Sequence, residues 1–192
     1  QIIDELPSDA TIFVASRTNE GLAGKNVTHI PFDVLQDDLP LDLLPSVIDG
    51  FAYCPGSINL RPFKGLKLEA FTSDFSINVI GAVKTLQQLQ PLLAASEQAS
   101  VVLFSTVAVQ TGMPFHASVA ASKGALEGLG RSLAAEWAPK VRVNVIAPSI
   151  TDTPLANRFL NNDAKKEKAA LRHPLKRIGT TQDVAQLAAF LL

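Results

Sequence analysis

The stretch HASVAASKGAL, residues 116–126, places a single lysine, Lys123, among small residues. Val119 precedes this lysine by four residues, so both side chains fall on one face if the stretch is helical. Apolar residues then recur at spacings of three and four, which predicts a helix over about 115–138. These residues are Leu126, Leu129, Leu133 and Trp137. The stretch therefore raises the question of what a lysine does in a closely packed helix whose neighbouring valine offers no chemistry.

Outward from this helix, short β-branched runs alternate with longer segments of helical period. Near-continuous apolar character is typical of strands that are buried on both faces. The predicted strands cover residues 11–16, 27–32, 50–54, 100–105 and 141–147. Further helices are predicted at about 66–90 and after Thr180, which is spaced from Asp183 as in a capping box. The alternation predicts an α/β fold, a doubly wound parallel sheet with helices on both faces and ligands at the carboxyl ends of its strands.

Composition limits the classes of function. The chain has 192 residues, 47% of them hydrophobic, which is consistent with a single domain over residues 1–192. Its 17 basic and 18 acidic residues leave a net charge of −1, so we expect neither nucleic acid nor a membrane surface as a partner. The single cysteine, Cys54, favours a reducing compartment, and a cytoplasmic protein is expected. The three scattered histidines predict no metal site.

Several short motifs, taken in chain order, resemble the short-chain dehydrogenase/reductase family. The resemblance rests on their collinearity along nearly the whole chain. The motifs are ASR (15–17), FDV (32–34), YCPG (53–56), INV (77–79), FST (104–106), ASKGAL (121–126), NVIAPSITDTPL (144–155) and HPLKRIGTTQDVAQLAAFLL (173–192). The resemblance implies a Rossmann-type fold and a small carbonyl or alcohol as substrate, which the region 148–178 would cover. It also implies a homodimer or homotetramer formed through the helices near 66–90 and 115–138.

The resemblance also implies elements that the 192 residues do not include. Family members begin with a strand and a Gly-rich turn around the cofactor pyrophosphate, and they end with a further strand. The only Gly-x-Gly in the chain, Gly128 and Gly130, lies within a helical pattern. The pyrophosphate-binding residues are therefore not assigned.

At the adenine end of the cofactor, the resemblance assigns residues after the first two strands. Arg17 follows Ser16, which stands where relatives that prefer NAD carry an acidic residue. A guanidinium can pair with a 2′-phosphate, so the pair favours NADP(H) over NAD(H) as cofactor. Asp33, followed by Val34, matches the family residue that binds the adenine amino group. An exposed arginine at a strand end and an ordinary loop aspartate are the alternatives.

At the nicotinamide end, the match is less complete. Gly56 matches a glycine at which the backbone approaches the cofactor, although residues 53–55 replace the other members of that motif. Pro148 begins a segment that flanks the nicotinamide in the family, with Ser149 at a glycine position. Thr153 falls at the threonine that reaches the carboxamide.

The catalytic residues of the family are matched except for one. Lys123 stands at the lysine that holds the nicotinamide ribose, Asn78 at the asparagine of a water relay and Thr106 at the serine that orients the carbonyl. The tyrosine that serves as acid and base, four residues before the lysine, is replaced by Val119. The usual mechanism therefore cannot operate unchanged.

Three interpretations remain open at this point. In the first, another group donates the proton, such as His116, one turn before Val119, with Ser118 or a lysine-bound water as alternatives. In the second, the protein binds NADP(H) without the family's chemistry. In the third, the fold serves only for assembly.

Overall fold

The computed structural model describes residues 1–192, and its strands lie where the sequence predicts them. Their ends shift by one or two residues from the predicted bounds. The strands are β1 (Phe13–Ser16), β2 (Thr28–Pro31), β3 (Gly50–Tyr53), β4 (Ala99–Phe104) and β5 (Val141–Ile146). Burial follows the apolar runs, since the first five residues of β4 are all buried. The prediction of strands covered on both faces is thus clearest for β4.

The helices connect these strands. The helices are α1 (Ile2–Glu5), α2 (Leu68–Phe75), α3 (Gly81–Ala94), α4 (Ala108–Thr111), α5 (Ala117–Trp137), α6 (Asp163–Leu171) and α7 (Thr181–Leu191). The short turns are η1 (Leu41–Leu43), η2 (Phe63–Gly65) and η4 (Pro154–Ala156), and η3 (Ser76–Ile80) is π-helical. The helix predicted over 66–90 is therefore α2, η3 and α3 in succession. Leu68, which the spacing placed with the apolar face, is 80% exposed.

All strand pairs are parallel, but the hydrogen bonding forms two sheets. One sheet has the order β1-β2 and the other the order β3-β4-β5. The expected α/β fold with parallel strands is confirmed. The break between the two sheets falls between β1 and β3.

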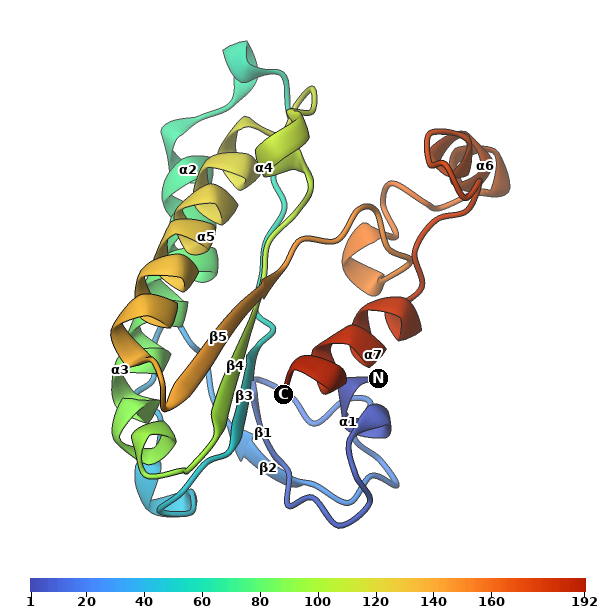
Figure 1. Cartoon of the computed structure of the whole chain (residues 1–192). Helices are drawn as coiled ribbons and strands as arrows, with labels where there is room; N and C mark the ends of the chain where they lie inside the picture. The colour runs from blue at the N-terminus through green and yellow to red at the C-terminus, as the bar shows by residue number, and fades with distance from the viewer.

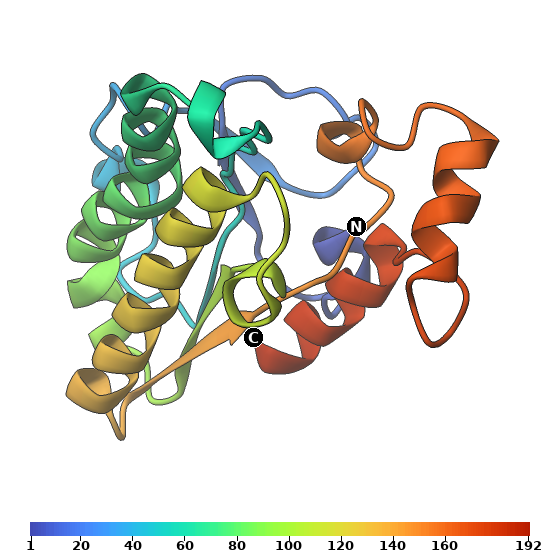
Figure 2. The same ribbon diagram turned by 90° about the horizontal axis from the view of Figure 1, so that it is seen from above.

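Helices cover both faces of the strands (Figure 1). Helices α2, α3 and α5 lie on one face and α1 and α7 on the other, and the view from above shows the same layers (Figure 2). The larger apolar cluster lies under α3 and α5 and includes Leu86, Leu103 and Leu126. A smaller cluster, formed by Val102, Ile146 and Ala188, packs α7 on the opposite face. No helix is both long and apolar enough to cross a bilayer.

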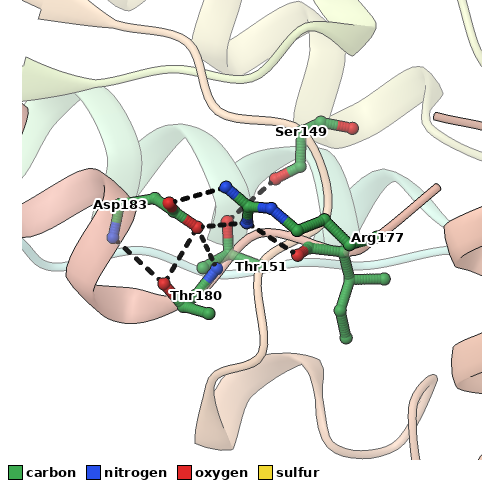
Figure 3. Close-up of polar contacts among 6 residues, drawn as sticks. Ser149, Thr151, Arg177, Thr180 and Asp183 are labelled. Carbon is green, nitrogen blue, oxygen red and sulfur yellow. Dashed lines mark hydrogen bonds and ion pairs between the residues drawn. The ribbon is translucent and has the colours of Figure 1, made fainter. Parts of the chain in front are cut away.

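The region 148–178 leaves the sheet after β5 and returns before α7. Its two ends are joined by an isolated bridge, in which the Asp152 N–H donates to the Gly179 carbonyl (2.8 Å) and the Gly179 N–H to the Ile150 carbonyl (3.0 Å). The predicted capping box is confirmed, since Thr180 and Asp183 bond reciprocally at the start of α7. Arg177 also donates to the Asp183 carboxylate (Figure 3). These contacts fix where the excursion begins and ends.

Candidate active site

Lys123 reaches from α5 to the carboxyl end of β4. Its side chain is buried, and Nζ donates to the Phe104 carbonyl at 2.7 Å. Burial lowers the pKa of Lys123 to about 8, against an opposing effect from the negative charge of Asp74. The ammonium keeps further N–H donors for a ligand. The lysine of the opening stretch therefore lies at the edge of the sheet where a ligand is expected.

Asn78 lies beside this lysine because of a local change in helix geometry. It is fully buried within the π-helical turn η3, and such turns often occur at functional sites. Its Nδ2 donates to Ser122 Oγ (3.0 Å), and its Oδ1 accepts from the Ser57 N–H (3.2 Å). These bonds hold the amide between α5 and the segment after β3.

Gly56 passes the same two side chains. A Cβ at this glycine would lie 3.5 Å from Asn78 Oδ1 and 3.7 Å from Lys123 Nζ. The structure thus brings together Gly56, Asn78 and Lys123, three residues that the sequence assigns to the site. They come from the segment after β3, from η3 and from α5.

Thr106 and His116 are not tied to this group by hydrogen bonds. Thr106 Oγ1, just after β4, accepts from the Ala108 N–H at 3.3 Å. His116 stands at the start of α5, where its Nδ1 lies 2.8 Å from the Pro114 carbonyl. Val119 is 4% exposed, so its side chain is packed against its neighbours.

The only tyrosine in the chain does not replace the missing one. Tyr53 is 2% exposed, and its hydroxyl donates to the Ile77 carbonyl at 2.6 Å. Burial raises the pKa of this phenol well above its usual value. Tyr53 therefore serves packing beneath α3.

The residues assigned to the adenine end follow β1 and β2. Arg17 is exposed directly after β1, and Ser16 Oγ donates to the Thr18 carbonyl (2.6 Å). His29, to which the sequence assigned no role, places Nε2 at 3.0 Å from Ser16 Oγ. Asp33 accepts the Leu35 N–H at 3.0 Å, as expected of a residue that shapes a loop.

The residue after Asp33 has a packing role. Val34 is half-buried and packs against the larger apolar cluster. A Cβ on Gly81 would lie 2.8 Å from its Cγ2, so the loop after β2 rests directly on the start of α3.

The segment assigned to the nicotinamide end begins the excursion. The Pro148 carbonyl accepts from the Val107 N–H (3.1 Å), which joins the loops after β4 and β5. Ser149 Oγ lies 2.6 Å from His173 Nε2, and Thr153 caps η4 by accepting from the Ala156 N–H. Ser149 and Thr153 are therefore already engaged within the region 148–178, and Pro148 with the loop after β4.

Sequence reasoning missed a buried carboxylate beneath the site. Asp74 is fully buried and accepts from Ser57 Oγ (2.6 Å), Asn59 Nδ2 (2.8 Å) and Ser118 Oγ (2.6 Å). Its position one helical turn before Asn78 was the available signal, since the two share a face. The structure groups no three His, Cys, Asp or Glu side chains as a metal site.

Comparison with known families and proteins matches this chain to reductases. Residues 45–192 match the family described as enoyl-(acyl carrier protein) reductase. A tropinone reductase homologue from Arabidopsis thaliana is 35% identical over 137 residues, which make up 71% of this chain and 52% of that protein. The chain thus spans about half the length of this relative.

Solved structures agree in fold. A short-chain dehydrogenase family protein from Francisella tularensis superposes with a TM-score of 0.88 at 24% identity, over 100% of this chain and 85% of that one. A gluconate 5-dehydrogenase from Burkholderia cenocepacia, in complex with NADP and tartrate, has a TM-score of 0.84 at 22% identity, over 95% and 78%. The chain belongs to the short-chain dehydrogenase/reductase family.

Proposed function

We propose that the protein is an NADP(H)-dependent oxidoreductase that interconverts a carbonyl and a hydroxyl group without a catalytic tyrosine. The observation that carries this proposal is the convergence of Lys123, Asn78 and Gly56 at the carboxyl end of the strands. An ammonium at a glycine-lined wall suits the hydroxyls of a nicotinamide ribose. Membership of the family and the reductase names of the relatives support the same reaction class.

The choice of NADP(H) over NAD(H) rests on the end of β1. Arg17 is exposed there, and neither it nor Ser16 carries a negative charge that would repel a 2′-phosphate. The Burkholderia relative in fold holds NADP, which supports a nicotinamide cofactor. Fluorescence titration should give tighter binding of NADPH than of NADH, and Arg17→Gln should remove the difference. Equal affinities in the unaltered protein would refute the preference.

In this proposal the protein binds the cofactor and the carbonyl and supplies a proton. NADPH, when bound, supplies the hydride. Lys123 would hold the ribose, Thr106 would orient the substrate oxygen by a hydrogen bond from its hydroxyl, and Asn78 would retain ordered water beside the lysine. The Thr106 hydroxyl accepts from the Ala108 N–H, so its own proton is free to be donated.

The proton donor remains the open role, and His116 is the proposed group. It lies one turn before Val119 at the start of α5, with one ring nitrogen held by the Pro114 carbonyl. Its second nitrogen is free to exchange a proton. Lys123 is the alternative, since a lysine with a pKa of about 8 can itself exchange a proton near neutral pH.

A carbonyl-substrate panel with two variants tests the reaction. His116→Ala should lower kcat by about 100-fold if the histidine is the general acid. The second variant, Val119→Tyr, restores a phenol four residues before Lys123. Its turnover should be higher than that of the unaltered protein. Turnover that survives in His116→Ala rules out the histidine and leaves Ser118, a lysine-bound water or Lys123 itself.

Val119 also favours a second function, in which the protein binds NADP(H) but does not react. The same measurements separate the two. NADPH binding without turnover on any substrate would support the silent cofactor-binding protein, and absence of NADPH binding would leave only a role in assembly.

A further inference from the structure

A cavity of about 410 Å³ opens beside the proposed catalytic group. Gly56, which adjoins Lys123 and Asn78, forms part of its wall, together with Ser57 and Asn59. Leu155 and Arg158, from the excursion after β5, also line it. The cavity is thus shared by the segment after β3 and the predicted substrate-covering region.

The buried carboxylate of Asp74 fixes the hydrogen-bonding character of one wall. An ionised carboxylate only accepts hydrogen bonds, so Ser57 and Asn59 must both donate toward it. The hydroxyl proton of Ser57 is then committed, and its oxygen can only accept from a ligand. The Asn59 amide retains its carbonyl oxygen as an acceptor and one N–H as a donor. This wall therefore offers mainly acceptors and suits a ligand with hydroxyl groups, which donate and accept hydrogen bonds.

Arg158 is the only charged residue that lines the cavity. The Arg158 guanidinium donates to the Ile58 carbonyl, and its Cζ lies 4.7 Å from the centroid of the Phe159 ring. Contact on two sides orients the guanidinium, while its other N–H groups remain for a ligand. A planar guanidinium matches a carboxylate in two parallel hydrogen bonds. The negative charge of Asp74, behind Ser57 and Asn59, disfavours a carboxylate beside those two residues.

We propose that this cavity binds a small hydroxylated carboxylic acid, with its carboxylate on Arg158 and its hydroxyls donating to Ser57 and Asn59. The proposal rests on the proposed oxidoreductase function and specifies its substrate class. In this arrangement Asp74 is a positioning residue that acts through Ser57 and Asn59.

Three four-carbon probes separate the two recognition elements. Threonate carries hydroxyls and a carboxylate, threitol carries hydroxyls alone, and butyrate carries a carboxylate alone. Calorimetric titration of the full chain, with and without saturating NADPH, should show threonate binding at least about tenfold more tightly than either of the others. Butyrate or threitol binding as tightly as threonate, or no binding of threonate, would overturn the proposal.

Single-residue variants test which side chain contacts each group of the probes. Arg158→Gln should weaken threonate binding about tenfold or more and leave threitol unchanged. Arg172→Gln, at another exposed arginine of the same excursion, is the matched control and should change neither. Ser57→Ala should weaken threonate and threitol, and Ser57→Thr should restore them.

The Asp74 contribution is read from the change in preference between probes. Asp74→Asn should lower the preference for threonate over butyrate, because the wall no longer needs to donate inward. This variant also removes a buried charge, so Ser57→Ala keeps the test valid if Asp74→Asn fails to fold. A protein that binds threonate as expected but not NADPH would disprove the proposed function and not the cavity assignment. A protein that binds NADPH and treats all three probes alike would disprove only the cavity assignment.

Discussion

Burial lowers the pKa of Lys123, so the charge of its ammonium should depend on pH in the alkaline range. Its pKa of about 8 lies below the ordinary 10.5, so the ammonium loses its proton within an accessible pH range. If this ammonium holds the cofactor, NADPH affinity should fall about tenfold between pH 7 and pH 9. Fluorescence titration over that range measures the effect. Lys123→Met should bind weakly at every pH, and an unchanged affinity of the unaltered protein across the range would contradict the role.

The same lysine should make folding stability depend on pH. Between pH 8 and 10.5 the unfolded chain keeps the proton that the folded protein has lost, so the free energy of unfolding rises with pH. The gain between pH 7.5 and 9.5 should be on the order of 2 kcal/mol, relative to Lys123→Met. Urea unfolding of both proteins at the two pH values measures it. Parallel changes in the two proteins would show that the lysine is not responsible.

Single residues differ in how far the sequence predicts them. Lys123, Asn78 and Gly56 could be assigned because each falls within a short motif. Asp74 was missed, because apolar spacing predicts core around it and its place one turn before Asn78 was the only signal. Its partners Ser57, Asn59 and Ser118 lie 15 to 44 residues away, and no spacing in the sequence connects them. Only the folded chain brings them together.

At the scale of elements, two of the three glycines of α5 have opposite roles. A Cβ on Gly130 would lie 2.5 Å from Val145 Cγ2 of β5, whereas a Cβ on Gly128 would meet nothing within 4 Å. Gly130→Ala should therefore destabilise the protein by roughly 1–3 kcal/mol through overpacking. Gly128→Ala should stabilise it by up to about 1 kcal/mol, because alanine favours the helix. Thermal unfolding of both variants measures these changes in stability. Equal changes in the two variants would refute the close packing of α5 on β5.

These glycines also show what the sequence settles about elements. Their helical spacing correctly excluded them from a phosphate-binding turn, since both lie within α5. The strands and the capping box of α7 follow equally from local pattern. The π-helical turn at Asn78 does not, because apolar spacing over 66–90 is equally compatible with a regular helix. Its geometry depends on the buried bonds that Asn78 makes to Ser57 and Ser122.

The whole molecule has helices on both faces of its strands, yet its two sheets do not pair with each other. The alternation of strands and helices predicted the layers, because each apolar face must be covered. It did not predict the break between β1 and β3, because strand order is a long-range property. The arrangement still places the ends of β3, β4 and β5 together, and Lys123 and Gly56 meet there.

The surface of α2, η3 and α3 provides the last prediction, which concerns assembly. Leu68 and Ile80 on this segment are 80% and 59% exposed, and we expect a second copy of the chain to cover them in a homodimer or homotetramer. Ile80→Glu should dissociate this assembly, because it would bury a charge without a partner. Phe190→Glu, on α7 over the opposite face of the sheet, is a matched control, since Phe190 is 83% exposed. Light scattering measures the mass of each protein. A monomeric unaltered protein would contradict the assembly, and dissociation by Phe190→Glu alone would place the interface elsewhere.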